Sequence, residues 1–315
     1  MKPVLSAFAG FLLLGTAAWG EAPVTDWVAN EVVVTEAQAQ GPAFWRIRKG
    51  PSEIWILGTV GQMPKDLAWN RSHLAEVIKG SRAVLTAPKA SAGFFSASWF
   101  LLTHRGLLSM PDGKRLEETL PPALKTRFVA ARTALKEDAK EFSDDPPVLA
   151  AVKLQGRYNE EHRLTSDEPW NSVARLAKDN KVPVRSLGDY DALAIVKEML
   201  RLPPEGQEKC LAESVAYTEM SAQHNAALSE AWAAGDVKQI KAHFVPRAFS
   251  DCIKQSASFG KFVDRAVADY LKAIHEALAQ PGKVVMVADI GALLRSTGVA
   301  EELTKEGIVI EGPAE

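Results

Sequence analysis

The sequence predicts an α/β fold with a central mixed sheet, flanking helices and a large helical insertion. Short, nearly continuous apolar runs that suit buried strands alternate with segments of helical periodicity. Two apolar-rich runs flank a Lys-Gly-Pro-Ser turn at residues 49–52, which is the pattern of a hairpin. Residues 190–280 contain long helical patterns without a clear strand, and we interpret them as an insertion or cap rather than a separate domain.

The elements after the hairpin are predicted from apolar spacing and from glycine and proline punctuation. In chain order they are a helix at 72–80, a buried strand at 81–88, mostly helical structure at 92–164, a helix, turn and strand at 168–189, two helices at 228–240 joined at Gly235-Asp236, a helix at 260–283, a buried strand running into a turn at 283–294, and a final strand at 307–312.

Composition excludes some classes of partner. The chain has 315 residues, of which 47% are hydrophobic and 24% charged, and these are ordinary globular values. The formal net charge of −2 gives no reason to expect binding to nucleic acid or to an anionic membrane surface.

The N-terminus has the three-part pattern of a secretory signal peptide. Lys2 supplies a positive charge, residues 4–18 are uninterrupted and apolar, and Ala18-Trp19-Gly20 places small residues before a cleavage point at Glu21. An uncleaved anchor is the alternative, but the apolar stretch is short for a span of about 20 residues. We therefore predict a signal peptide at 1–20, a flexible leader at 21–41 and a single domain at 42–315, in a periplasmic or secreted protein without an integral membrane segment after signal removal.

Cys210 and Cys252 are the two cysteines of the chain. In an oxidising compartment two thiols tend to pair, so the sequence predicts a disulfide bond between them. Two isolated buried thiols are the alternative. A CxxC motif is absent, which argues against thiol chemistry as the function.

Several polar or small residues follow the predicted strands. The apolar run 54–57 leads into Gly58-Thr59-Val60-Gly61, a pattern typical of the mouth of an active site, yet Gly61 stands where a ligand or nucleophile is expected. Asp289 follows the Val-Val-Met-Val-Ala strand and has the chemistry of an acid, a base or a ligand, or it caps the next helix. Arg265 is a candidate for holding an anionic group, or it forms a structural ion pair.

This order of strand ends resembles the TraB/GumN family, which includes the Tiki metalloproteases, over residues 42–312. Several small segments of the chain match motifs of that family. Three strand-end segments align with family motifs: Gly58-Thr59-Val60-Gly61 with a Gly-Thr-x-His turn, Thr86 with a Glu at the end of a strand, and Leu187-Gly188 with a Leu-Glu pair. Two helical segments align as well: Trp232 to Asp236 with an Ala-Trp and Gly-Asp segment, and Arg265 with an Arg on a helix. Ala292 aligns with the His of a second Gly-x-x-His motif, whose Gly falls on Asp289.

The resemblance implies an active-site architecture without its metal. Two imidazoles and a carboxylate form an ordinary set of ligands for a divalent metal that activates water. Gly61 and Ala292 have no donor atoms, and Thr86 is a weak neutral ligand. We expect no cofactor and a pseudoenzyme that binds a peptide, glycan or protein ligand at the remaining cleft. An active hydrolase with a shifted or metal-free site around Asp289, Thr59 and Arg265, or an exported scaffold without a cleft function, are the alternatives.

The six histidines do not supply an obvious replacement for the missing ligands. They form neither an HxxxH nor an HxH pair in the sequence. His73 and Glu76 stand three residues apart on a predicted helix, where such pairs are mostly solvated side-chain contacts.

Overall fold

The structure is a computed structural model that describes residues 26–27, 33–34, 41–91, 99, 102–103, 105–246, 252, 257–296 and 298–313. The predicted signal peptide lies outside the described residues. Among the described helices, none combines the length and the apolar character that crossing a bilayer requires.

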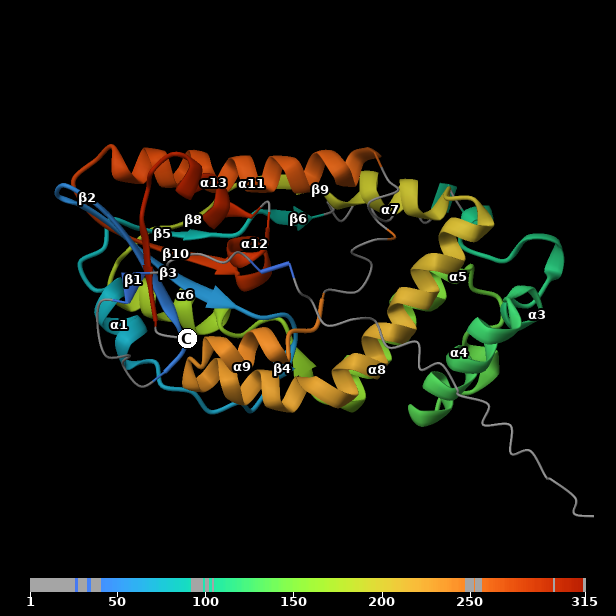
Figure 1. Cartoon of the computed structure of the whole chain (residues 1–315). Coiled ribbons are helices and arrows are strands. Elements are labelled where there is room, and N and C mark those ends of the chain that lie inside the picture. Colours follow the sequence, from blue (N-terminus) through green and yellow to red (C-terminus); the bar gives the residue numbers. More distant parts are fainter. Residues whose placement is uncertain are drawn as a thin grey trace, which may run out of the picture.

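A mixed seven-stranded sheet organises the described part of the chain, which confirms the α/β prediction (Figure 1). Its strands run in the order β1-β11-β2-β3-β10-β5-β8. The strands of this sheet are β1 (Val33–Val34), β2 (Phe44–Lys49), β3 (Ser52–Thr59), β5 (Ala83–Thr86), β8 (Val184–Ser186), β10 (Gly282–Asp289) and β11 (Ile310–Gly312). Two further pairs join β4 (Met63–Pro64) to β7 (Leu164–Thr165) and β6 (Lys89–Ser91) to β9 (Asp189–Asp191).

The centre of the sheet forms from its most apolar runs. Strands β2 and β3 are the predicted hairpin, and their antiparallel register pairs Lys49 with Ser52 across the turn. Strand β10 lies between β3 and β5 and is parallel to both. Its residues 284–288 are all buried, as expected of a strand covered on both faces.

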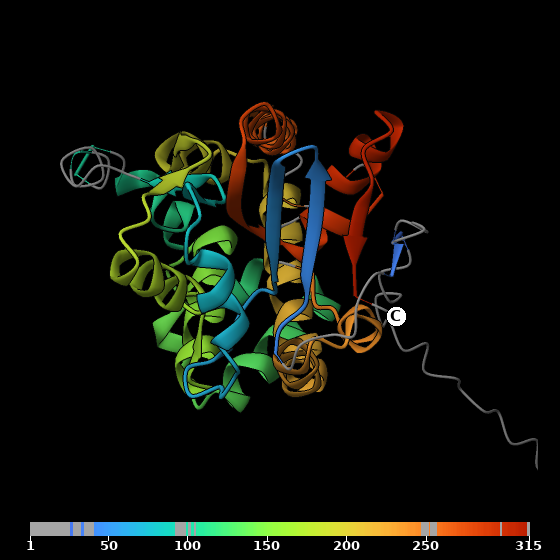
Figure 2. The same ribbon diagram turned by 90° about the vertical axis from the view of Figure 1, so that its left-hand side faces the viewer.

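Helices cover both faces of the sheet. Figure 1 shows α11 (Ala257–Leu278) along one side and α1 (Ser72–Ile78) and α6 (Trp170–Asp179) along the other, and Figure 2 shows α11 end-on beside the β2–β3 hairpin. The short helices α12 (Ile290–Leu294) and α13 (Val299–Lys305) connect β10 to β11. This layering explains why the parallel strands lack the alternation of a half-exposed sheet.

A helical region lies beyond the end of the sheet toward which β3 and β10 point (Figure 1). It combines helices at 116–161, from the stretch predicted as mostly helical, with helices at 192–242 of the insertion predicted at 190–280. Helix α11 also falls in that predicted range, but it lies along the sheet and contacts β3. The long helix of the helical region, α8 (Pro204–Ala234), runs next to α5 (Pro147–Glu161) and packs against the short helix α9 (Val237–Ala242) that follows it. The other α-helices described in this region are α3 (Leu116–Thr119), α4 (Pro122–Ala134) and α7 (Ala192–Leu200).

The turn between α8 and α9 is built as the sequence predicts. Gly235 ends α8 with φ of 73°, a left-handed conformation that glycine adopts at little cost. Asp236 then caps α9, because its side chain accepts a hydrogen bond from the backbone N–H of Gln239 at 2.9 Å.

The leader contacts the body at two places, whereas the sequence predicted a flexible segment at 21–41. The carboxylate of Asp26 accepts hydrogen bonds from the guanidinium of Arg295, the shortest at 2.8 Å, and Trp27 packs edge-on against Phe244 with ring centroids 5.1 Å apart. Strand β1 pairs with β11. The Arg295 hydrogen bonds lower the pKa of Asp26, so this contact favours the ionised carboxylate.

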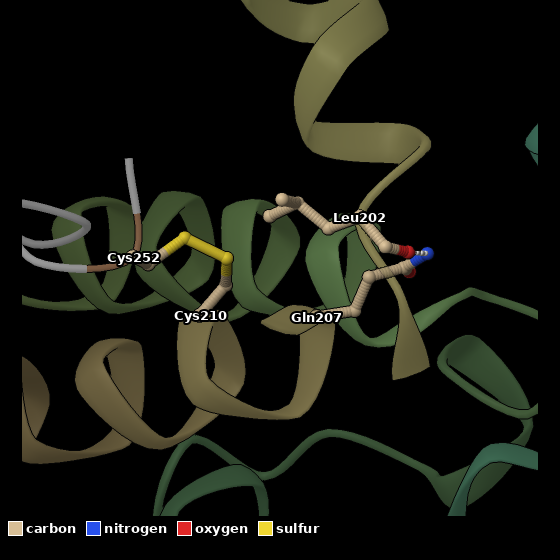
Figure 3. The surroundings of a disulfide bond; sticks show 4 residues. All are labelled: Leu202, Gln207, Cys210 and Cys252. Atoms are coloured by element: carbon tan, nitrogen blue, oxygen red, sulfur yellow. Dashed lines mark hydrogen bonds between the residues drawn. A yellow bond between two sulfur atoms is a disulfide. The ribbon is translucent and has the colours of Figure 1, made fainter. Parts of the chain in front are cut away.

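The two cysteines are placed in disulfide geometry, as predicted. Cys210 and Cys252 are both fully buried and their Cα atoms are 4.9 Å apart. Figure 3 shows the bond at the start of α8, where the side chain of Gln207 also donates to the carbonyl of Leu202 at 3.0 Å. The start of α8 is thus fixed to the chain that precedes α11.

Candidate functional site

Four parallel strands end at the same edge of the sheet, which we call the carboxyl edge. Strand β10 aligns Asp289 with Thr59 of β3 and Met286 with Leu85 of β5, and β5 in turn aligns Thr86 with Ser186 of β8. Because parallel strands share a direction, the segments that follow β3, β5, β8 and β10 all emerge at this edge. The strand ends that the sequence singled out therefore belong to neighbouring strands.

The end of β3 is fixed by a tryptophan from α8. The indole N–H of Trp232 donates to the carbonyl of Gly58 at 2.8 Å, and both residues are buried. A Cβ atom on Gly58 would stand 2.4 Å from the Trp45 ring and 2.7 Å from the side chain of Ile290. Glycine is therefore required here by packing, and the Ala-Trp segment of α8 serves to hold the end of β3.

Thr59 and Asp289 both have structural hydrogen bonds. The Thr59 hydroxyl donates to the carbonyl of Ala288 at 3.2 Å, which links the ends of β3 and β10. One Asp289 oxygen accepts the backbone N–H of Ala292 at 3.2 Å and caps α12. The capping interpretation of Asp289 thus holds, and Ala292 is half-buried one turn into the helix.

Gly61 and Thr86 have different surroundings. A Cβ atom on Gly61 would meet no atom within 4 Å, so this position has room for a side chain. Thr86 is buried, and its hydroxyl lies 3.4 Å from the carbonyl of Arg185, to which it donates. Neither residue offers a charged or imidazole group to the carboxyl edge.

A carboxylate from α11 occupies the place of the missing side chain at Gly188. One oxygen of Asp269 lies 2.8 Å from where a Cβ atom of residue 188 would stand, and it accepts a hydrogen bond from the Tyr190 hydroxyl. The guanidinium of Arg265 lies over the Tyr190 ring at 5.3 Å. Burial, followed by the hydrogen bond to Asp269, raises the pKa of Tyr190 to about 12. Tyr190 thus lies between Gly188, whose added Cβ would stand 3.2 Å from its ring, and Arg265, which is stacked on that ring.

An open pocket of about 260 Å³ extends from this cluster along the face of the sheet beneath α11. Its wall includes Asp269 and Ser186 and, among the charged residues, Arg82, Arg185 and Lys272. Arg82 is engaged in the wall itself, since its guanidinium donates to the carbonyl of Ala277 at 3.0 Å. The pocket is polar and carries charges of both signs.

The residues at the carboxyl edge do not fit a catalytic divalent metal. Gly61, Thr86 and Ala292 supply one neutral hydroxyl in place of two imidazoles and a carboxylate. Over the described ranges, no three side chains of His, Cys, Asp or Glu gather into a group that could hold a metal ion. Asp289, the one carboxylate at the end of β10, is used as a helix cap.

Several contacts at the site escaped sequence reasoning. Trp69 packs against Trp232 with ring centroids 5.2 Å apart, and Asp269 and Tyr190 form the cluster beside Gly188. Trp69, the one aromatic residue of the segment 60–71 after β3, gave a weak signal for the first contact. Nothing local marks the second, because Tyr190 and Asp269 are 79 residues apart in the chain.

Comparison with known proteins agrees with this arrangement. No curated protein and no solved structure matches the chain. The model of the TraB/PrgY/gumN family matches residues 43–312, which is most of the chain and nearly the range of the resemblance stated above. The chain belongs to the TraB/PrgY/gumN family.

Proposed function

We propose that this protein is an exported, catalytically degenerate member of its family that binds a ligand or partner at the carboxyl edge. The observation that carries the proposal is the set Gly61, Thr86 and Ala292, which lie at the ends of adjacent strands or just after them and lack the groups that metal-dependent hydrolysis needs. Gly58 and Trp232, which match motifs of the family, build this edge.

Structural use of the polar residues argues against the alternative of an active hydrolase. A general base must reach the proton it abstracts, and Asp289 and Thr59 already have backbone partners within the fold. Arg265 is exposed and stacked on Tyr190. A peptidase or esterase assay with and without a chelator tests this, since turnover by the purified protein would favour the hydrolase.

A thermal-shift screen with peptides, glycans and candidate proteins tests ligand binding. A ligand that binds only the native state must raise Tm. Gly61→Trp should abolish the rise, because the free space at residue 61 would be filled. Val309→Trp, at an exposed position just before β11, is the matched control and should keep the rise. A rise that survives in Gly61→Trp would place the ligand elsewhere, and the scaffold alternative predicts no rise for any class.

Export is part of the proposal and follows from the signal sequence at 1–20. The mature protein is expected to begin at about Glu21, and mass spectrometry of periplasmic or secreted material measures this. Intact protein that begins at Met1 and is released only by detergent would instead identify an uncleaved anchor.

A further inference from the structure

Two histidines that are 19 residues apart meet on the α8–α9 turn. The Nδ1 atoms of His224, on α8, and His243, which follows α9, are 3.2 Å apart, and the ring centroids are separated by 5.4 Å. The two positions lie on either side of the Gly235 turn, so the antiparallel arrangement of the helices brings them together. Both rings are half-buried, which fixes them without closing them off from water.

We propose that His224 and His243 form a binding site for a divalent transition metal, separate from the degenerate positions at the carboxyl edge. Two imidazole nitrogens that each lie 2.0–2.1 Å from a zinc ion and 3.2 Å from each other subtend an angle of roughly 100° at the metal. This is close to the tetrahedral angle. The pair therefore matches half of a tetrahedral metal site.

The protonation chemistry of the pair is compatible with metal binding. Without a metal, one Nδ1–H can donate to the lone pair of the other Nδ1, so at least one lone pair already faces the partner ring. When a metal binds, this proton leaves Nδ1 and a proton is taken up from water at Nε2 of the same ring, so both imidazoles stay neutral and present their Nδ1 lone pairs to the metal. Neutral imidazole is the ligand type that suits zinc, copper and nickel. Two coordination positions remain for water or for donor atoms of a bound molecule.

The neighbouring cation points elsewhere. Lys241, two residues before His243, lies with its ammonium group 6.0 Å from the centre of the Trp27 ring. Residues two apart on a helix do not face each other. Phe244, the residue after His243, packs against Trp27 of the leader.

Calorimetric titration of the untagged, chelator-treated protein with zinc tests the site. One ion per chain is expected. His224→Gln and His243→Gln should each weaken binding at least about tenfold, because even changes that only misorient a ligand cost that much. His275→Gln is the matched control. His275 is half exposed and lies 2.5 Å from Glu306, so it is another possible weak metal ligand, and its loss should leave the affinity unchanged.

A spectroscopic measurement covers the case in which a variant fails to fold. Electron paramagnetic resonance of the wild-type protein with one equivalent of copper(II) should show two coordinated imidazole nitrogens. The proposal would be overturned if the wild-type protein bound no zinc. It would also be overturned if His275→Gln lost the affinity for zinc and His224→Gln retained it. A signal from a single nitrogen, or an Nδ1–H···Nδ1 hydrogen bond that persists in NMR spectra at saturating zinc, would also overturn it.

Discussion

At the residue scale, Gly58 and Gly61 differ in what surrounds them although only two residues separate them. Gly58 is enclosed by Trp45 and Ile290, and its carbonyl accepts the Trp232 N–H. Gly61 faces open space. The first glycine is a packing requirement of the strand end, whereas the second has room for a side chain and is the position at which we propose that a metal ligand is missing. Gly58 therefore matters for the packing of the fold, whereas Gly61 matters for the proposed site.

This difference predicts that the same substitution destabilises the protein at residue 58 and has little effect at residue 61. Gly58→Ala should lower the free energy of unfolding by about 1–3 kcal/mol, because an added methyl group overpacks a rigid core contact. Gly61→Ala should change it by less than about 0.5 kcal/mol, as for other substitutions without a new contact. Urea unfolding of both variants measures the difference. Equal stability of the two would show that the end of β3 is not packed as described.

At the element scale, the contact of the leader with α12 depends on the ionised Asp26. The hydrogen bond and charge of Arg295 lower the pKa of this carboxyl in the folded protein. Such a group stabilises the folded arrangement above its unfolded pKa of about 3.8, and the contribution is lost as the pH falls through the lowered folded value. The leader should therefore stay attached at neutral pH and loosen in acid.

Hydrogen exchange at the Ser296 amide measures this attachment. That N–H donates to the backbone carbonyl of Asp26 at 2.7 Å, so it is protected only while the leader is bound. At pH 6, Asp26→Asn should speed its exchange relative to wild type, and the difference should shrink below the folded pKa of Asp26. An unchanged exchange rate in Asp26→Asn would mean that the carboxylate does not hold the leader.

The disulfide acts on the same scale by linking α8 to the segment before α11. The bond closes a loop of 42 residues, for which the chain-entropy model gives about 4 kcal/mol of stabilisation. The double variant Cys210→Ser with Cys252→Ser should lose stability of this order. Thiol titration of unfolded, non-reduced protein should find no free thiol, and two reactive thiols would refute the bond.

At the scale of the whole molecule, the sequence determined the elements more firmly than their contacts. Apolar runs identified β3, β5 and β10, because a strand that is buried on both faces needs apolar side chains along its whole length. An aspartate directly after a strand or a turn identified the helix caps at Asp236 and Asp289. These signals are local in the sequence, so they can be read without knowledge of the tertiary structure. The boundaries shifted by a few residues; the strand expected at 81–88, for example, is Ala83–Thr86.

Contacts between distant segments could not be predicted in this way. Asp26 bonds Arg295 across 269 residues, and Asp269 fills the space beside Gly188 from a different helix. Such pairs depend on how helices dock, which apolar periodicity does not specify. The contact between His224 and His243 is easier to predict than these pairs but harder than a single helix or strand. It follows from the sequence once the helices on either side of Gly235 are assumed to be antiparallel.

We propose that Gly61, Thr86 and Ala292 occupy the positions of lost metal ligands at one edge of the sheet. Calorimetry with zinc tests it on the variant Gly61→His, Thr86→Glu and Ala292→His, in a His224→Gln, His243→Gln background so that the proposed histidine pair does not contribute. The parent background should bind no zinc tightly, and the folded triple variant should bind one ion, because three protein ligands with water complete a tetrahedral site. Gly61→His alone should not bind tightly. Tight stoichiometric binding by the parent background would mean that other residues bind the metal. No binding by a folded triple variant would mean that residues 61, 86 and 292 do not stand at former ligand positions.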